Sequence, residues 1–294
     1  MSTSASWQLA HSLVESWDDS LDLDSSPATL TAALISMTSS LADHLVTPGQ
    51  LAEHLTRVHD HLAGIPLQVE GRRRTTPKAV ARVLDSLEAR LALVPLLERF
   101  AALRAEHAAL DFADQVSLAA RIARTVPQAG RLARRLHRVV LLDEFQDTSV
   151  AQLEMLTDLF GPGHAACAVG DPQQAIYGWR GASAASLAGF ARSFATDDQP
   201  VLQRTLSTSW RNDQAVLAVA NRLAAPLRQA GSGITIPELH ARPGAGEGAA
   251  EILEASDERA EAGAIAEWIL RRRGESAEDE EAPSAAVLVR ARRQ

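Results

Sequence analysis

Two stretches decide the fold of this chain: RVVLLDEFQDTS (residues 138–149) and VGDPQQAIYGWRGA (residues 169–182). Four consecutive apolar residues at 139–142 predict a strand that is buried on both faces of a parallel sheet. Asp143 and Glu144 follow directly, at the strand end where open α/β sheets place their ligands. Buried carboxylates require a cation, and one or two carboxylates plus substrate phosphates hold Mg²⁺. For these two residues alone a solvated turn would be favoured, and the neighbouring residues shift the prediction to a Mg²⁺ site.

The composition sets the broad class of the protein. The chain has 294 residues, is 46% hydrophobic and carries a net charge of −8, so a nucleic-acid site would have to be a local patch. Its single cysteine, Cys167, excludes an internal disulfide framework and favours a reducing cytoplasm. Because Cys167 lies in the apolar run AACAV, it is expected in the core. No apolar run reaches membrane-spanning length and no signal peptide is visible, so a cytoplasmic protein without a membrane partner is expected.

Four stretches resemble the UvrD/PcrA/Rep group of superfamily 1 ATP-dependent DNA helicases. DEFQDTS and the 169–182 stretch resemble motifs II and III of that group. TLSTSWRNDQAVLAVANRL (residues 205–223) resembles its motif IV block, and ALDFADQVSLAARI (residues 109–122) resembles the segment that re-enters the first motor domain. The amino-acid sequence of several stretches is also similar to that of the AdnB-type motor of actinobacterial helicase–nuclease complexes. The resemblance is convincing from about residue 109 to 293, and it implies an α/β, RecA-like parallel sheet of the P-loop NTPase type.

The resemblance implies an ATP and Mg²⁺ site. Asp143 and Glu144 match the metal-binding carboxylates, and Glu144 would also act as general base on the attacking water. Gln174 matches the residue that senses the terminal phosphate, which suits an uncharged amide donor. Arg211 matches the arginine that stabilises transition-state charge, with a helix-end salt bridge as its alternative. Trp210 stands where the group usually has an adenine-stacking tyrosine, and the exchange keeps an aromatic face.

The resemblance also implies a surface for single-stranded DNA. Tyr177 and Trp179 match the positions that contact bases, and Arg180 lies beside them. Aromatic faces stack on any base, so such a surface binds without sequence preference. Considered alone, Trp179 would more often be a core residue. The chain departs from the group at Ala175, usually serine, and at Gln173, often acidic, and neither departure removes a role.

Three regions follow from the patterns and the resemblance. Residues 1–108 are expected to be helical, a remnant of the inserted domain called 1B, with Pro95 interrupting a long helix pair. Residues 109–205 are expected to be part of motor domain 1A, with a second buried strand at 165–169. Residues 206–294 are expected to begin motor domain 2A. Further strands are expected at 201–206, 250–253 and 285–289, and residues 131–138 read as a basic connector.

The lysine content bears on catalysis. Lys78 is the only lysine and lies in TTPKAV, so the chain lacks the Gly-rich turn ending in Lys-Ser/Thr that cradles phosphates. The group's later motifs are missing as well, so an internal fragment is expected. By resemblance the parent would be a helicase or translocase moving 3′ to 5′ on single-stranded or duplex DNA in repair or recombination. The isolated chain is predicted to lack ATPase activity. The alternatives are a non-catalytic DNA-binding or regulatory fragment, and a motor half that needs a second motor subunit, with a nuclease as a further partner.

Overall fold

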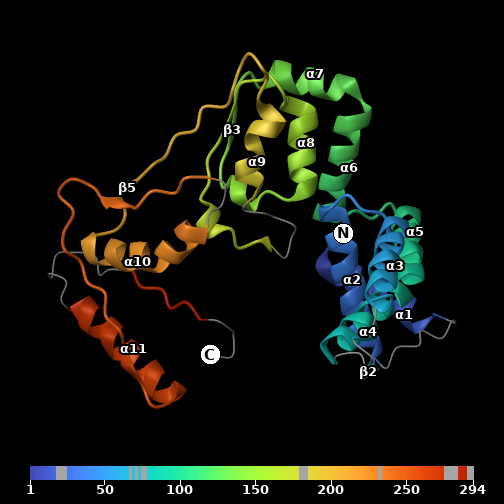
Figure 1. The fold of residues 1–294 in the computed structure, drawn as a ribbon, viewed down its shortest axis with the longest axis horizontal. Coiled ribbons are helices and arrows are strands. Elements are labelled where there is room, and N and C mark those ends of the chain that lie inside the picture. Colours follow the sequence, from blue (N-terminus) through green and yellow to red (C-terminus); the bar gives the residue numbers. More distant parts are fainter. Residues whose placement is uncertain are drawn as a thin grey trace. The chain divides into compact units, whose positions relative to one another are not determined.

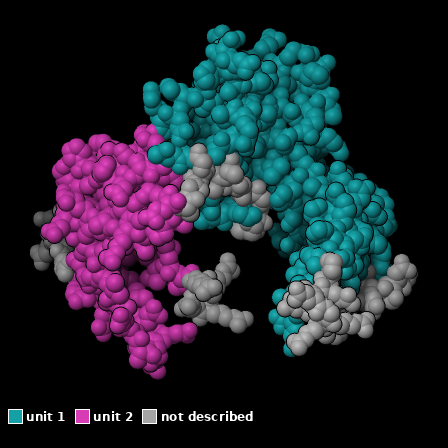
Figure 2. All heavy atoms as spheres, viewed as in Figure 1, with its two compact units in different colours: residues 1–204, 230–235 teal, residues 205–229, 236–294 magenta. Residues whose placement is uncertain are grey.

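The computed structural model describes residues 1–17, 25–65, 68–69, 72–73, 78–178, 185–230, 234–274 and 284–289. These residues fall into two compact units, which Figure 2 shows in different colours. The first unit contains residues 1–204 and 230–235, and the second contains residues 205–229 and 236–294. The chain thus divides between Arg204 and Thr205, at the start of the motif IV block.

The first part of unit 1 is helical, as predicted. Its elements are α1 (Thr3–Glu15), α2 (Pro27–Asp43), α3 (Pro48–Ala63), a short antiparallel pair of β1 (Gln68–Val69) and β2 (Arg72–Arg73), α4 (Lys78–Ala92) and α5 (Val94–Glu106). Side chains of Ser2, Ser26 and Thr47 cap the first three helices by accepting a backbone N–H. The predicted interruption at Pro95 is confirmed, since α4 ends at Ala92 and α5 begins at Val94. The helices bury an apolar core that includes Leu34, Leu96 and Phe100.

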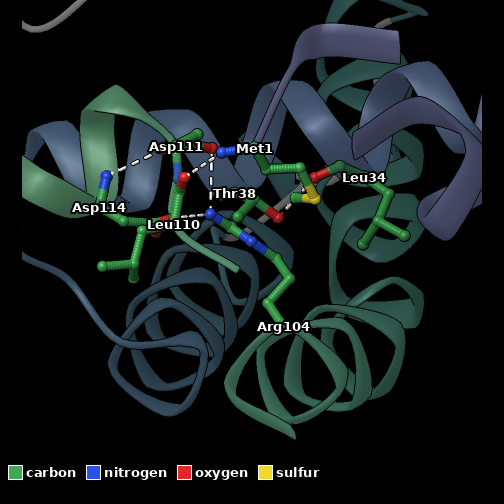
Figure 3. Close-up of polar contacts among 7 residues, drawn as sticks. All are labelled: Met1, Leu34, Thr38, Arg104, Leu110, Asp111 and Asp114. Carbon is green, nitrogen blue, oxygen red and sulfur yellow. Dashed lines mark hydrogen bonds and ion pairs between the residues drawn. The ribbon is translucent and has the colours of Figure 1, made fainter. Parts of the chain in front are cut away.

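A buried ion cluster joins the end of α5 to the start of α6 (Phe112–Thr125) (Figure 3). The guanidinium of Arg104 is almost fully buried and pairs with the carboxylates of Asp111, at 3.0 Å, and Asp114. Asp111 also caps α6 by accepting from the backbone N–H of Asp114, and the Met1 amino group donates to the Leu110 carbonyl. The cluster therefore fixes the connection between the helical region and α6 by charge as well as by packing.

Arg104→Ala is expected to destabilise the protein far more than Arg99→Ala on the same helix. Removing one partner of a buried ion pair costs about 3–5 kcal/mol, and the partial exposure of Asp111 and Asp114 reduces this to about 2–3 kcal/mol. The Arg99–Glu106 pair is about half exposed on both sides, so its loss should cost at most about 1 kcal/mol. Urea unfolding of the two variants measures both values. Equal shifts of the unfolding midpoint would show that the Arg104 cluster is not a determinant of stability.

The α3–α4 contact carries a pH-sensitive histidine. Hydrogen bonds from the His59 ring to Asp60, at 3.2 Å, and to Glu88 on α4, at 3.1 Å, raise the pKa of His59 above its ordinary value of 6.5. A raised pKa stabilises the folded state fully below pH 6.5, and this contribution is lost as the pH rises through the folded value. Glu88→Gln should lower the pKa of His59 in an NMR titration, whereas Glu106→Gln on α5 should not. An unchanged His59 titration in Glu88→Gln would disprove the contact.

The rest of unit 1 is α/β, as predicted. Its elements are α6, α7 (Pro127–Leu136), β3 (Val140–Leu142), the 3₁₀ turn η1 (Phe145–Asp147), α8 (Val150–Phe160), β4 (Ala166–Ala168), the 3₁₀ turn η2 (Pro172–Gln174) and α9 (Ala185–Phe194). Strands β3 and β4 pair in parallel, with Leu141 opposite Cys167. Figure 1 shows α8 and α9 beside this strand pair, where four buried phenylalanines form the core: Phe145, Phe160, Phe190 and Phe194.

The strand pair is covered on one face only, and this corrects two predictions. Val140, Leu142, Ala166 and Ala168 pack against the phenylalanine core. Residues between them point to the opposite face, where Leu141 is 77% exposed and Cys167 is exposed as well. The strand is therefore not buried on both faces, and Cys167 is not a core residue, because α8 and α9 lie on one side and no described element covers the other.

Helix α7 replaces the predicted basic connector. It begins with Pro127 at its first turn, and Arg134 donates to the carbonyls of Leu159 and Gly161, at 2.7 Å each. These bonds satisfy carbonyls at the end of α8 that have no helical partner. One arginine of the basic run is thus structural.

Unit 2 contains β5 (Thr208–Ser209), α10 (Gln214–Ala230), β6 (His240–Ala241) and α11 (Glu258–Gly274), with β5 and β6 paired in parallel. The strands predicted at 201–206, 250–253 and 285–289 are not formed, and Ile252 and Leu288 are almost fully exposed. A strand requires a neighbour to pair its backbone N–H and C=O groups, and no described segment supplies one at these positions. No helix in the described residues is both long and apolar enough to cross a bilayer.

Candidate functional site

The parallel pairing of β3 and β4 brings motif II and motif III to the same edge of the sheet. The backbone N–H of Val169 donates to the Leu142 carbonyl at 2.8 Å, and the N–H of Phe145 donates to the Val169 carbonyl at 2.9 Å. Asp143 and Glu144 therefore leave β3 beside the start of the 170–178 loop that follows β4. The carboxyl edge of such a sheet is where α/β proteins bind ligands.

Glu144 adopts a backbone conformation that is unusual for its residue type. Its φ of 49° and ψ of 39° are left-handed, a region that costs a non-glycine residue about 1–2 kcal/mol. Its N–H donates to Asp143 Oδ1 at 3.0 Å, and its Oε2 accepts from Gln146 Nε2 at 2.7 Å. Strain of this kind clusters at functional sites.

Both carboxylates of the pair are exposed, which corrects the expectation of a buried site. Water solvates Asp143 and Glu144, so burial by itself does not force a cation on them. Among the described residues no three His, Cys, Asp or Glu side chains form a metal-holding group. Two adjacent carboxylates nevertheless match the way Mg²⁺ is held, by one or two carboxylates with the substrate phosphates completing its shell. The Oδ1 atom of Asp147, in the same turn, is buried and has no hydrogen-bond partner among the described residues.

Gln174 ends η2 and has an exposed side chain. Its Nε2 donates to Asp171 Oδ2 at 2.8 Å, and Asp171 Oδ1 accepts from the backbone N–H of Gln173 at 2.9 Å. Asp171 thus shapes the turn and orients the amide of Gln174.

The sequence patterns missed two residues of this site, Asp171 and Gln146. Gln146 is 1% exposed, and its Oε1 accepts from the backbone N–H of Asp171 at 3.0 Å. One signal in the sequence pointed to Gln146: it is a polar residue directly after the core residue Phe145. No corresponding signal pointed to Asp171.

The predicted DNA-contacting residues are only partly described. Tyr177 is 38% exposed on the loop that follows Gln174, whereas Trp179 and Arg180 lie outside the described residues. Trp210 and Arg211 are exposed in unit 2, between β5 and α10, while Asp143, Glu144 and Gln174 belong to unit 1. The structure therefore brings together the carboxylates and the 170–178 loop.

The UvrD/REP helicase N-terminal domain matches residues 8–195, more than half of the chain. The chain belongs to the UvrD/REP helicase family. The match includes the helical region, which extends the family relationship well before residue 109. A greater closeness to the AdnB-type motor stays a prediction.

Several relatives of this UvrD/REP chain are DNA helicases by name. It is 32% identical over 194 residues to ATP-dependent DNA helicase UvrD1 of Mycobacterium tuberculosis, covering 64% of this chain and 21% of the relative. It is 36% identical over 107 residues to RecBCD enzyme subunit RecB of Mycolicibacterium smegmatis, covering 35% and 9%. It is 29% identical over 115 residues to ATP-dependent DNA helicase PcrA of Staphylococcus aureus, covering 39% and 15%. The chain thus spans about a fifth or less of the length of these relatives.

Proposed function

We propose that this chain is part of an ATP-dependent DNA helicase or translocase that acts in DNA repair or recombination and moves 3′ to 5′. The observation that carries the proposal is the meeting of Glu144 and the Gln174 loop at the carboxyl edge of β3 and β4. The family relationship supports the reaction class, and the helicase names of the relatives support the DNA substrate.

In this proposal each residue has a defined task at the nucleotide, and Glu144 has two. Asp143 and Glu144 would hold Mg²⁺, and the ion would neutralise charge on the phosphates of ATP. Glu144 accepts the proton of the attacking water, and its carboxylate is held in place by Gln146. Gln174 donates to the terminal phosphate. Trp210 stacks on adenine, and Arg211 places a guanidinium on the phosphate as charge develops.

The DNA surface consists of Tyr177, Trp179 and Arg180. Residues 177–180 follow Gln174 closely in the sequence, so we expect a change at the phosphate to be passed along a short segment to the aromatic residues that hold a base. A coupling of this kind requires no sequence preference in the DNA.

Trp179→Ala should weaken binding of a single-stranded oligonucleotide by about 5- to 150-fold, since stacking on one base is worth about 1–3 kcal/mol. Fluorescence anisotropy at low salt measures the affinity, which should fall as salt is added. Trp7→Ala, in the helical region, is the matched control and should leave the affinity unchanged. Absence of binding at low salt, or equal affinities of the two variants, would disprove this surface.

A motor half that works with a second chain is the second candidate function. The exposed face of β3 and β4 around Leu141 and Cys167 favours it, because another polypeptide could cover these apolar residues. One relative is by name a subunit of the RecBCD enzyme, which supports a partner subunit, and a nuclease is the further partner that we propose. A non-catalytic DNA-binding or regulatory role would retain the Tyr177 loop and leave Glu144 without a task.

A further inference from the structure

The buried side-chain amide of Gln146 makes a hydrogen bond at each end, one to motif II and one to motif III. Nε2 donates to Glu144 Oε2 at 2.7 Å, and Oε1 accepts from the backbone N–H of Asp171 at 3.0 Å. A carboxylate only accepts and a backbone N–H only donates, so these two partners determine which end of the amide faces which motif. Only an amide side chain of this length satisfies both.

The contact continues from Asp171 to the end of η2. Asp171 Oδ2 accepts from Gln174 Nε2 at 2.8 Å, and the Asp171 backbone N–H is the group bound to Gln146. The result is an unbroken series of contacts from the Glu144 carboxylate, through Gln146 and Asp171, to the amide of Gln174.

Gly170 leaves the space that this series requires. A Cβ added at Gly170 would lie 2.4 Å from Gln146 Oε1, and the backbone nitrogens of Gln146 and Phe145 would lie 3.2 and 3.3 Å away. Any side chain at position 170 must therefore displace the amide of Gln146. A Cβ at Gly178, on the same loop, would meet nothing within 4 Å.

We propose that Gln146 is a positioning residue that couples the carboxylate of Glu144 to the loop that carries Gln174. The roles of Glu144 as base and Gln174 as phosphate sensor rest on the proposed function, whereas the coupling itself rests on the contacts above. A movement of the Glu144 carboxylate shifts the amide of Gln146, and this changes the hydrogen bond that holds Asp171. The general base and the phosphate-sensing loop thereby respond to each other.

Hydrogen exchange of the Asp171 amide, measured by NMR on residues 1–294, tests the contact directly. Gln146→Met keeps most of the side-chain volume and removes both hydrogen bonds, so exchange at Asp171 should rise about 10-fold or more. Gly170→Ala should raise it as well, because its Cβ displaces the amide. Gly178→Ala is the matched control and should leave it unchanged. Unaltered exchange in Gln146→Met and Gly170→Ala would overturn the proposal.

Glu144→Ala separates coupling from simple anchoring of the loop. No hydrogen bond joins Glu144 to Asp171 among the described residues, yet removal of the Glu144 carboxylate should raise exchange at Asp171 by freeing Nε2 of Gln146. In a Gln146→Met background the same change should have no further effect. If Glu144→Ala leaves Asp171 unaffected, the coupling is disproved. Glu144 is exposed, so this variant decides the question even if Gln146→Met does not fold. Failure of nucleotide or DNA binding would refute the proposed function and leave these exchange results standing.

Discussion

A protein of residues 1–294 is expected to show no ATP hydrolysis that single-stranded DNA stimulates. In the proposed function Asp143 and Glu144 would supply the metal-binding pair, Glu144 the base, Gln174 the sensor and Arg211 the charge clamp. Phosphoryl transfer depends mainly on positioning and on electrostatic stabilisation, and this sequence contains no Gly-rich loop ending in Lys-Ser/Thr. Turnover should therefore lie at least about 1,000-fold below that of a protein with such a loop, by comparison with the loss of one charge clamp.

The measurement is phosphate release with and without an oligonucleotide, at saturating Mg²⁺ and ATP. Addition of a polypeptide that carries a phosphate-binding loop should restore turnover if this chain is a motor half, and Glu144→Gln should then abolish it. Arg99→Ala, which lies on α5 and outside the proposed site, is the control that should preserve the restored rate. DNA-stimulated turnover by the isolated chain, lost in Glu144→Gln, would contradict the expectation and reveal a phosphate-binding site elsewhere in the sequence.

Phe145→Ala is expected to lower the free energy of unfolding by about 3–5 kcal/mol, the usual cost of truncating a buried phenylalanine. Its ring is fully buried and lies edge-on to Phe190, with centroids 5.5 Å apart. Because Phe145 stands between Glu144 and Gln146, the cavity would also loosen the turn that holds the carboxylate. A loss of this size is a large fraction of the about 5–15 kcal/mol that stabilises a typical domain.

Phe112→Ala is the matched control, since Phe112 begins α6 with 86% of its surface exposed. Its effect on the free energy of unfolding, measured with urea, should stay within about 0.5 kcal/mol. If Phe145→Ala fails to fold, Phe145→Leu should fold with a smaller loss of about 1–2 kcal/mol. Equal midpoints for the alanine variants at 145 and 112 would show that the phenylalanine cluster is not the core of this unit.

Several local features were predictable because their causes lie within a few residues. Ser149 and Gln152 have capping-box spacing, and both hydrogen bonds of the box are present in the structure. Pro95 interrupts a helix because its ring and missing N–H are local properties. In contrast, the apolar pattern of residues 112–125 does not reveal that Phe112 is exposed while α6 buries Ala120 and Ala123. Which side of a helix is buried depends on the elements packed against it, and periodicity does not specify those elements.

The sequence by itself determined the family, the α/β class and the two motifs. In the structure these motifs follow two adjacent parallel strands. Strand propensity, turn-forming residues and motif sequences are properties of contiguous residues, so they can be recognised from the sequence. Tertiary structure alone decided that Leu141 and Cys167 face outward, and that Gln146 touches Glu144 on one side and Asp171 on the other. Residues 146 and 171 are far apart in sequence and meet only because β3 and β4 pair in parallel, with their carboxyl ends at one edge.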